Sequence, residues 1–184
     1  LAAALVAAAP FSQAQAQAQA PVVTAEVRAR AETVPVGTTA DDAADDPAIW
    51  LNWRDPAASL IVATDKKAGL YVYGMDGKVR HFMADGRLNN VDLVDMGRAG
   101  IMVVASDRND ETAARLRLYR LDTATARLVP VAVFDGGAGE AYGVCLVRRG
   151  SGFDAFSVLK DGLVAQVQVK LGKSPRGTIV RYLK

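Results

Sequence analysis

Three short apolar segments of the sequence each end directly before a basic side chain. The run IVATD is followed by Lys66 and Lys67, the run VVASD by Arg108, and the run FSVL by Lys160. Lys66 lies 42 residues before Arg108, which lies 52 residues before Lys160. Lysine and arginine are the side chains that bind phosphate oxygens, arginine often through two parallel hydrogen bonds. Because basic residues are also common in turns, it is the regular repetition that favours a shared anion site.

Acidic and amide side chains form a second group, and they precede or begin other apolar segments. The group comprises Asp41, Asp42, Asp45 and Asp46, then Asn89, Asn90 and Asp92, then Glu140 with Tyr142. Carboxylate and amide oxygens are hard ligands that suit Ca²⁺ or Mg²⁺ better than zinc or copper. The first cluster lacks the spacing of an EF-hand loop and, taken alone, is more typical of a solvated acidic turn than of a metal site. Beside repeated cations, however, these oxygens predict a site for a polyanion that also binds a metal ion.

The composition excludes several other kinds of site. One Cys in 184 residues cannot form an internal disulfide or a Cys-rich zinc centre, and one His excludes a multi-His metal centre. We expect Cys145, in an apolar run, to be a core residue, and His81 to lie at the surface and not to act as a nucleophile. The net charge of +2, from 22 basic and 20 acidic residues, argues against a nucleic-acid partner.

The first twenty residues have the composition of an export signal. They carry no charge, ten of them are Ala, and the end of the segment repeats the small-x-small cleavage pattern. The apolar part is too short to span a bilayer. The sequence therefore predicts a signal-peptide remnant over 1–20 and a secreted or periplasmic protein without a membrane partner after signal removal, although a disordered Ala/Gln tail is an alternative. Since no initiator Met precedes this segment, we expect the chain to be a fragment.

The elements that must position these side chains are β-strands. Short Val-, Leu- and Tyr-rich runs alternate with polar residues, Gly-containing turns separate them, and no sustained 3.6-residue period is present beyond one possible helical turn at 111–115. The strands fall into three sets of four: 48–51, 60–64, 70–73 and 79–82; 91–94, 101–106, 115–121 and 128–134; 142–147, 153–159, 163–170 and 178–183.

Each set spans the length of a four-stranded propeller blade. A β-sandwich also uses strands at this spacing and is the alternative fold. The cation that follows the second strand of every set favours the propeller, because equivalent strand ends of successive blades surround the same mouth of the central channel. The sequence therefore predicts an all-β fold of antiparallel propeller blades.

Several motifs with these residues resemble the β-propeller phytases, the alkaline calcium-dependent phytases of bacteria. The longest are DAADDPAIW at 42–50, TDKKAGL at 64–70 and GRLNNVD at 86–92. The shorter motifs ASDR at 105–108, EAYG at 140–143 and LKDG at 159–162 follow in the family's order. The resemblance covers residues 31–170.

The resemblance implies a six-bladed propeller of which about three blades are present, with 21–184 as the N-terminal part of the phytase domain. It implies a calcium-dependent hydrolase of the 3-phytase type. Its substrate is phytate, myo-inositol hexakisphosphate, whose phosphate monoesters are cleaved by direct attack of water. For the full-length enzyme the resemblance implies a monomer.

Carried over by motif, the resemblance also implies residue roles. It assigns Ca²⁺ binding to Asp45, Asp46 and Glu32, and phosphate contacts to Lys66, Lys67, Arg108, Tyr142 and Lys160, of which Lys66, Arg108, Tyr142 and Lys160 are the catalytic set. Asn89, Asn90 and Asp92 are expected to hold loops through hydrogen bonds. The family needs further acidic ligands from later blades, and the sequence ends at Lys184. Two alternatives therefore remain: a truncated, non-catalytic propeller that binds phosphorylated ligands or calcium, and an interaction propeller whose cations are ordinary turn residues.

Overall fold

The computed structural model describes residues 24–29, 31–39 and 42–184. The chain divides into two units, Leu1–Arg30 and Ala31–Lys184. The described residues of the first unit, 24–29, form no helix or strand. The signal-peptide prediction for 1–20 lies outside the described residues. In the described part of the chain, no helix has the length and apolar character needed to cross a membrane.

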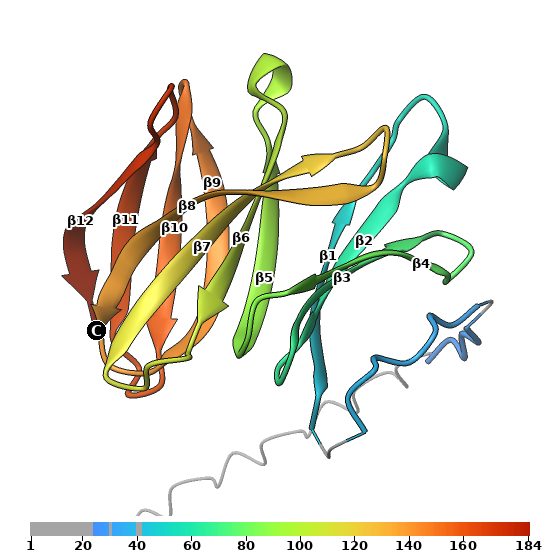
Figure 1. The fold of residues 1–184 in the computed structure, drawn as a ribbon, viewed down its shortest axis with the longest axis horizontal. Coiled ribbons are helices and arrows are strands. Elements are labelled where there is room, and N and C mark those ends of the chain that lie inside the picture. Colours follow the sequence, from blue (N-terminus) through green and yellow to red (C-terminus); the bar gives the residue numbers. More distant parts are fainter. Residues whose placement is uncertain (1–23, 30, 40–41) are drawn as a thin grey trace, which may run out of the picture. The chain divides into compact units, whose positions relative to one another are not determined.

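The described residues of the second unit form twelve strands in three four-stranded antiparallel sheets (Figure 1). In each sheet the strands are neighbours in chain order, as in a meander. Sheet 1 contains β1 (Ala44–Trp50), β2 (Leu60–Asp65), β3 (Gly69–Gly74) and β4 (Val79–Ala84). Sheet 2 contains β5 (Leu88–Asp95), β6 (Ile101–Asp107), β7 (Ala113–Asp122) and β8 (Arg127–Ala138). Sheet 3 contains β9 (Ala141–Arg149), β10 (Gly152–Leu159), β11 (Val164–Lys170) and β12 (Arg176–Leu183).

These sheets confirm the predicted all-β fold and its three sets of four strands. The consecutive pairing is that of propeller blades and differs from a sandwich, in which strands return across two sheets. Two 3₁₀ helices, Pro56–Ala58 and Gly97–Ala99, occupy the connections after β1 and β5. The helical turn expected at 111–115 is wrong, since β7 already begins at Ala113.

Two of the first strands begin earlier than the alternation of the sequence indicated. β1 starts at Ala44 and β5 at Leu88, and both extensions carry polar residues. Each contains a register shift against its second strand, between Ala44 and Pro47 in β1 and between Leu88 and Val91 in β5. A β-bulge of this kind redirects side chains and breaks the two-residue period on which the prediction relied.

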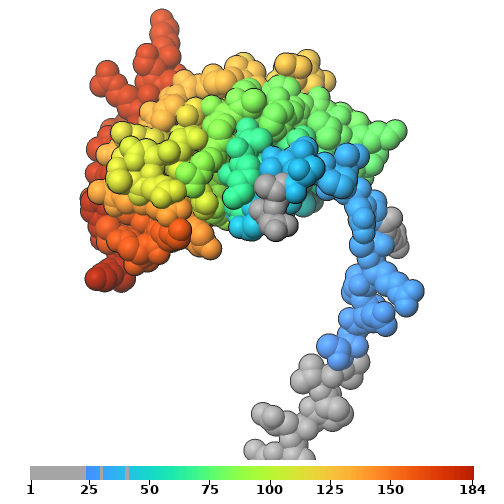
Figure 2. All heavy atoms as spheres, turned by 60° about the horizontal axis from the view of Figure 1, so that its bottom comes forward, coloured from blue at the N-terminus to red at the C-terminus, as the bar shows by residue number. Residues whose placement is uncertain are grey.

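The sheets pack face to face, and their first strands are adjacent. β5 contacts β1 on one side and β9 on the other, and Figure 2 shows the spheres of successive sheets in direct contact. A single strand can contribute to both interfaces, because successive side chains point to opposite faces of the sheet. Val103 of β6 lies in the core between sheets 1 and 2, and its neighbour Val104 lies in the core between sheets 2 and 3. The stacking therefore fixes where the ends of β1, β5 and β9 lie.

The same alternation explains why the expectation for Cys145 is wrong. Cys145 is exposed, whereas Val144 and Leu146 on either side of it pack against the core between sheets 2 and 3. Successive residues of a strand point to opposite faces, so Cys145 of β9 points away from that core. His81 on β4 is half-buried, and its Nδ1 accepts a hydrogen bond from the Leu128 N–H of β8 at 3.2 Å.

Candidate active site

The three predicted cations occupy one equivalent position in the three sheets. Lys66 directly follows β2, Arg108 follows β6 and Lys160 follows β10. The backbone N–H of each donates to the carbonyl oxygen of the residue that precedes the first strand of its own sheet. The pairs are Lys66 with Ala43 at 2.7 Å, Arg108 with Arg87 at 3.0 Å and Lys160 with Glu140 at 3.0 Å. The sequence spacing therefore reflects a structural repeat.

The turn that carries Lys66 and Lys67 has a fixed conformation. Gly69, the first residue of β3, has φ of +142°, and a Cβ at this position would collide with the carbonyl oxygen of Met83. A side chain would therefore be strained there, and glycine is required. The carboxylate of Asp65 accepts the N–H of Lys67 at 3.0 Å and closes the turn from inside.

Lys66 is buried and lies between two carboxylates. Its Nζ is 2.5 Å from Oδ1 of Asp42 and 3.5 Å from Oδ1 of Asp45. The hydrogen bond that Lys66 donates to Asp42 raises the pKa of Lys66, and the same bond lowers the pKa of the Asp42 carboxyl. Lys67, in contrast, is exposed. Lys66 is therefore a fixed, charged ammonium group, while Lys67 extends into solvent.

Arg108 is held by groups from two sheets. Its Nη1 donates to Oδ1 of Asn89 at 2.8 Å and lies 3.6 Å from Oε1 of Glu140. Its Nε is buried and has no hydrogen-bond partner among the described residues. A buried donor without a partner costs free energy of about 1–3 kcal/mol, so this N–H is an energetic cost of holding Arg108 in place.

Lys160 and Tyr142 lie on sheet 3. Nζ of Lys160 donates to Oε2 of Glu140 at 2.9 Å, and this bond lowers the pKa of the Glu140 carboxyl. The Tyr142 side chain is exposed, but its backbone carbonyl accepts from Oγ of Ser106 at 2.7 Å and from Nδ2 of Asn89 at 3.2 Å. Tyr142 is therefore anchored through its backbone, and its ring is left accessible to solvent.

The polar residues beside the cations also join neighbouring sheets. Asp46 of β1 accepts the N–H of Val91 at 3.0 Å, and Asp92 of β5 accepts the N–H of Leu146 at 2.7 Å. Asn90 is bonded through its N–H to Oγ of Ser106 at 2.9 Å. These contacts agree with the expected hydrogen-bonding role of Asn89, Asn90 and Asp92.

The three residues assigned to Ca²⁺ do not come together. The carbonyl of Glu32 lies against Gly77 in the turn after β3, at the opposite end of that strand from Lys66. One carboxylate oxygen of Asp46 accepts the backbone N–H of Val91, whereas the carboxylate of Asp45 lies 3.5 Å from Nζ of Lys66. Within the described ranges, no group of three His, Cys, Asp or Glu side chains could hold a metal ion. The carboxylates that do converge are those of Asp42 and Asp45.

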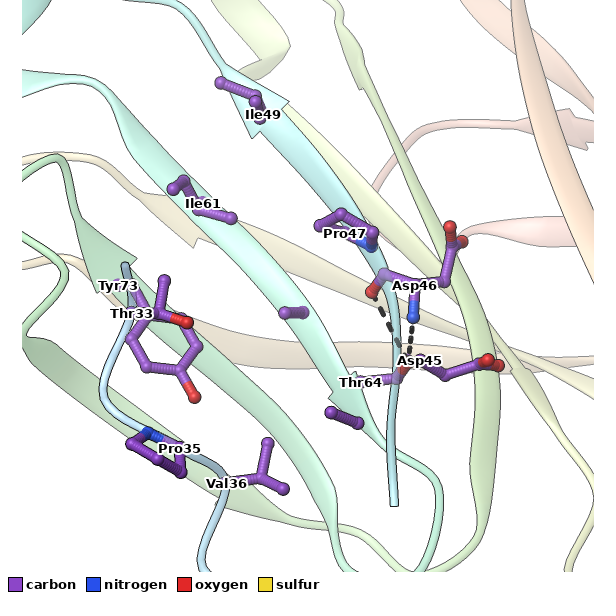
Figure 3. Close-up of a pocket in the computed structure, with 12 residues that line it drawn as sticks. Thr33, Pro35, Val36, Asp45, Asp46, Pro47, Ile49, Ile61, Thr64 and Tyr73 are labelled. Atoms are coloured by element: carbon purple, nitrogen blue, oxygen red, sulfur yellow. Dashed lines mark hydrogen bonds between the residues drawn. The ribbon is translucent and has the colours of Figure 1, made fainter. Parts of the chain in front are cut away.

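We call the three cations and the side chains that contact them the cluster: Lys66, Arg108, Lys160, Asp42, Asp45, Asn89 and Glu140. A separate hollow of about 340 Å³ lies beside Asp45 (Figure 3). It is bounded by residues 33–36 and by β1, β2 and β3, and its walls are mostly apolar: Pro35, Val36, Pro47, Ile49, Ile61 and Tyr73. The carboxylates of Asp45 and Asp46 point away from residues 33–36 in Figure 3. No cation of the cluster lines the hollow, so we place the candidate site at the cations.

Two side chains beside the cations received no individual role from the sequence, and a third was expected only to hold a loop. Asp42 makes the shortest contact with Lys66, Glu140 contacts both Arg108 and Lys160, and Asn89 links Arg108 to the backbone of Tyr142. All three belong to motifs noted in the sequence. The signal that would have identified them is their position at or beside the first strand of a sheet, directly opposite a cation that follows the second strand.

Three antiparallel sheets that each bring one cation to an equivalent strand end define an all-β protein built from propeller-type blades. The chain belongs to the phytase family, whose model matches residues 1–178. A curated relative, the 3-phytase of Bacillus subtilis (strain 168), is 41% identical over 100 residues, which are 53% of this chain and 26% of the relative. The chain therefore spans about a quarter of the length of this relative. The predicted resemblance to phytases is confirmed.

Proposed function

We propose that this chain is part of an enzyme that hydrolyses the phosphate monoesters of phytate. The observation that carries this proposal is the repeated cation: Lys66, Arg108 and Lys160 share one position in three adjacent sheets. Glu140 contacts both Arg108 and Lys160, and the charge of Arg108 also acts on Asp42 beside Lys66. Three cations at equivalent strand ends of adjacent sheets would suit a substrate with several phosphate groups, and family membership supports the same assignment.

The basic side chains and Tyr142 would neutralise and orient the phosphate group in this reaction. A phosphate monoester carries about −1.5 to −2 charges at neutral pH and repels an attacking water. Its uncatalysed hydrolysis is so slow that enzymes accelerate it by up to ~10²¹-fold. Lys66, Arg108 and Lys160 would bind and orient the phosphate oxygens. The exposed Tyr142 hydroxyl would donate a further hydrogen bond, and Lys67 would attract the substrate from solvent.

The carboxylates near Lys66 suit calcium as hard oxygen donors. Asp42 and Asp45 already converge on one cation, the Lys66 ammonium, so they fit a metal ion in charge and direction. We propose that Asp45 and Asp42 would contribute two carboxylates to a Ca²⁺ site, because these are the carboxylates that converge among the described residues. Since Ca²⁺ takes six to eight oxygens, water and substrate phosphate would complete its shell. When bound, calcium supplies Lewis-acid stabilisation of the phosphoryl charge and lowers the pKa of a coordinated water.

A second candidate function is binding without catalysis, since the chain aligns with only a small part of the Bacillus relative. Because the aligned part is 26% of the Bacillus relative, this chain could bind phosphorylated ligands or calcium without turnover. In a third possibility, an interaction propeller, the cations serve only the ion pairs seen with Asp42, Asp45 and Glu140.

Phosphate release from phytate, measured with Ca²⁺ and with a chelator, separates these functions. The enzyme requires calcium-dependent release that falls at least 100-fold in Lys66→Met, Arg108→Met and Lys160→Met. The matched control is Lys78→Met, because Lys78 is an exposed lysine in the turn after β3 and lies outside the cluster. Calorimetric binding of phytate without release would support the non-catalytic function. Release that is unchanged in all three variants contradicts the assignment of the site.

We also propose that the protein is exported and that its full-length form is a monomer. The uncharged first twenty residues support export. Cell fractionation followed by sequencing of the mature N-terminus tests the first point, and light scattering tests the second.

A further inference from the structure

Glu140 occupies an unusual place among the charged residues of the site. Its side chain is 13% exposed and its two oxygens have different partners: Oε1 lies 3.6 Å from Nη1 of Arg108, and Oε2 accepts from Nζ of Lys160 at 2.9 Å. Its backbone carbonyl also accepts the N–H of Lys160 at 3.0 Å. One residue therefore contacts cations that belong to two different sheets.

We infer that Glu140 is a positioning residue that fixes the separation and orientation of Arg108 and Lys160. This inference rests on the proposed function, because positioning matters where both cations must meet one substrate. Glu140 itself touches no reacting atom. It acts through the two cations, which in turn contact phosphate oxygens.

The two cations need such a residue for different reasons. The Lys160 side chain is 60% exposed, so without a partner its four-carbon stem would sample many rotamers. The Arg108 side chain is only 15% exposed, and of its nitrogens Nη1 is held by Asn89 while Nε has no partner. Glu140 thus orders a mobile cation and completes the support of a buried one. Misplacement of a catalytic group by about 1 Å can cost on the order of 10² in rate, so this support is significant.

Positioning and simple charge balance predict different behaviour. If Glu140 only reduced the positive charge, its removal would strengthen anion binding and leave turnover unchanged, and Asp would replace it fully. If Glu140 positions the cations, Asp fails in part, because a side chain one methylene shorter cannot reach both Arg108 and Lys160. An interaction lost only in the transition state lowers kcat, whereas loss of uniform binding raises KM alone.

The first experiment measures phytate hydrolysis by the full chain with Ca²⁺ for Glu140→Gln and Glu140→Asp. We expect kcat to fall at least tenfold in Glu140→Gln and at least threefold in Glu140→Asp, with KM changed less than threefold in both. The matched control is Glu111→Gln, since Glu111 pairs with Arg87 in an exposed ion pair and contacts neither cation. Unchanged kcat in Glu140→Gln, or full activity of Glu140→Asp, would overturn the inference.

A second measurement does not depend on activity. In nitrogen-15 NMR spectra, hydrogen exchange of the Arg108 Nε–H reports the burial of this guanidinium, and Arg108→Lys identifies the signal. We expect exchange to accelerate at least tenfold in Glu140→Gln while a near-ultraviolet circular dichroism spectrum stays native. Exchange at the wild-type rate would overturn the positioning role. If the wild-type chain releases no phosphate but Glu140 still controls this exchange, the proposed function fails and the positioning of Arg108 stands.

Discussion

The Asp46 carboxylate accepts the backbone N–H of Val91 at 3.0 Å and so joins the first strand of sheet 1 to the first strand of sheet 2. Val91 is 3% exposed and lies where the ladder of β5 is interrupted by a register shift. Its N–H therefore depends on a side chain for a partner. The residue that the family resemblance assigns to calcium thus has a structural role of its own.

The first prediction concerns this bond. Asp46→Ala leaves the buried Val91 N–H without an acceptor, and we expect the free energy of unfolding to fall by about 1–3 kcal/mol. Urea unfolding in the presence of a chelator measures this loss without any contribution from metal. Asp46→Asn is the matched control, because its amide oxygen still accepts the bond. Equal stability of the Ala and Asn variants would show that the contact contributes nothing.

The second prediction concerns the charged network between sheets 1 and 2. Arg117 of β7 contacts Asp85 at 2.5 Å and Asp107 at 2.6 Å, and Asp85 also accepts from the Tyr119 hydroxyl. Burial and the bond to Asp85 raise the pKa of Tyr119. Asp85→Ala leaves the buried Tyr119 hydroxyl without its acceptor while Arg117 keeps Asp107, and we expect a loss of about 1–3 kcal/mol in urea unfolding.

The matched control for the network is Asp76→Ala. Asp76 forms an ion pair with Arg80 at 2.8 Å, and both side chains are well exposed. Such pairs contribute about 0–1 kcal/mol because solvent screens them. A loss in Asp85→Ala no larger than in Asp76→Ala would contradict a structural role for the network.

The third prediction concerns pH and His81. Burial lowers the pKa of His81, as does the nearby charge of Arg127, and its neutral Nδ1 accepts the Leu128 N–H. A histidine with a lowered folded-state pKa binds fewer protons than in the unfolded chain, so its contribution is fully present above the unfolded pKa of about 6.5. We expect stability to fall as pH decreases through this value. His81→Gln should weaken that dependence in unfolding experiments between pH 5 and 8, and an identical pH profile would count against it.

The fourth prediction concerns competition between Lys66 and calcium. The Lys66 ammonium lies between Asp42 and Asp45, so a metal ion at these carboxylates must displace or share it. Lys66→Met removes the competing charge, and we expect calcium to bind about tenfold more tightly, equivalent to about 1.4 kcal/mol. Calorimetric titration with CaCl₂ tests this, with Lys78→Met as control. Weaker binding in Lys66→Met would show that Lys66 does not compete.

Much of the fold follows from the sequence because the core strands are short apolar runs separated by turn residues. In β6 every residue is buried, and successive side chains enter the two cores in turn, so the strand is visible as a continuous apolar run. All twelve strands were predicted from such runs. The starts of β1 and β5 escaped prediction because their polar residues, such as Asp45 and Asn89, bind side chains and neighbouring strands across a bulge. Local periodicity does not encode such contacts.

For the candidate site, the sequence identified the three cations but not the side chains that hold them. The cations were identified by their spacing, since a repeat of whole sheets places Lys66, Arg108 and Lys160 at the same strand end. Their partners were not, because the bond of Glu140 to Lys160 bridges 20 residues and that of Asn89 to the Tyr142 carbonyl bridges 53. Glu32 shows the opposite case: an assignment by motif alone placed it with Asp45, and the backbone carries it to the other end of β3.

The hydrogen bonds between first strands have a consequence for the order of folding. Within each sheet the strands pair with their chain neighbours, so a sheet can form from contacts that are close in sequence. The bonds that the N–H groups of Val91 and Leu146 donate to Asp46 and Asp92 instead span 45 and 54 residues. Closing such long loops is slow, so the sheets would dock after they form. In a nascent chain each sheet would therefore place its own cation as it forms, and the three cations would come together only when the sheets dock.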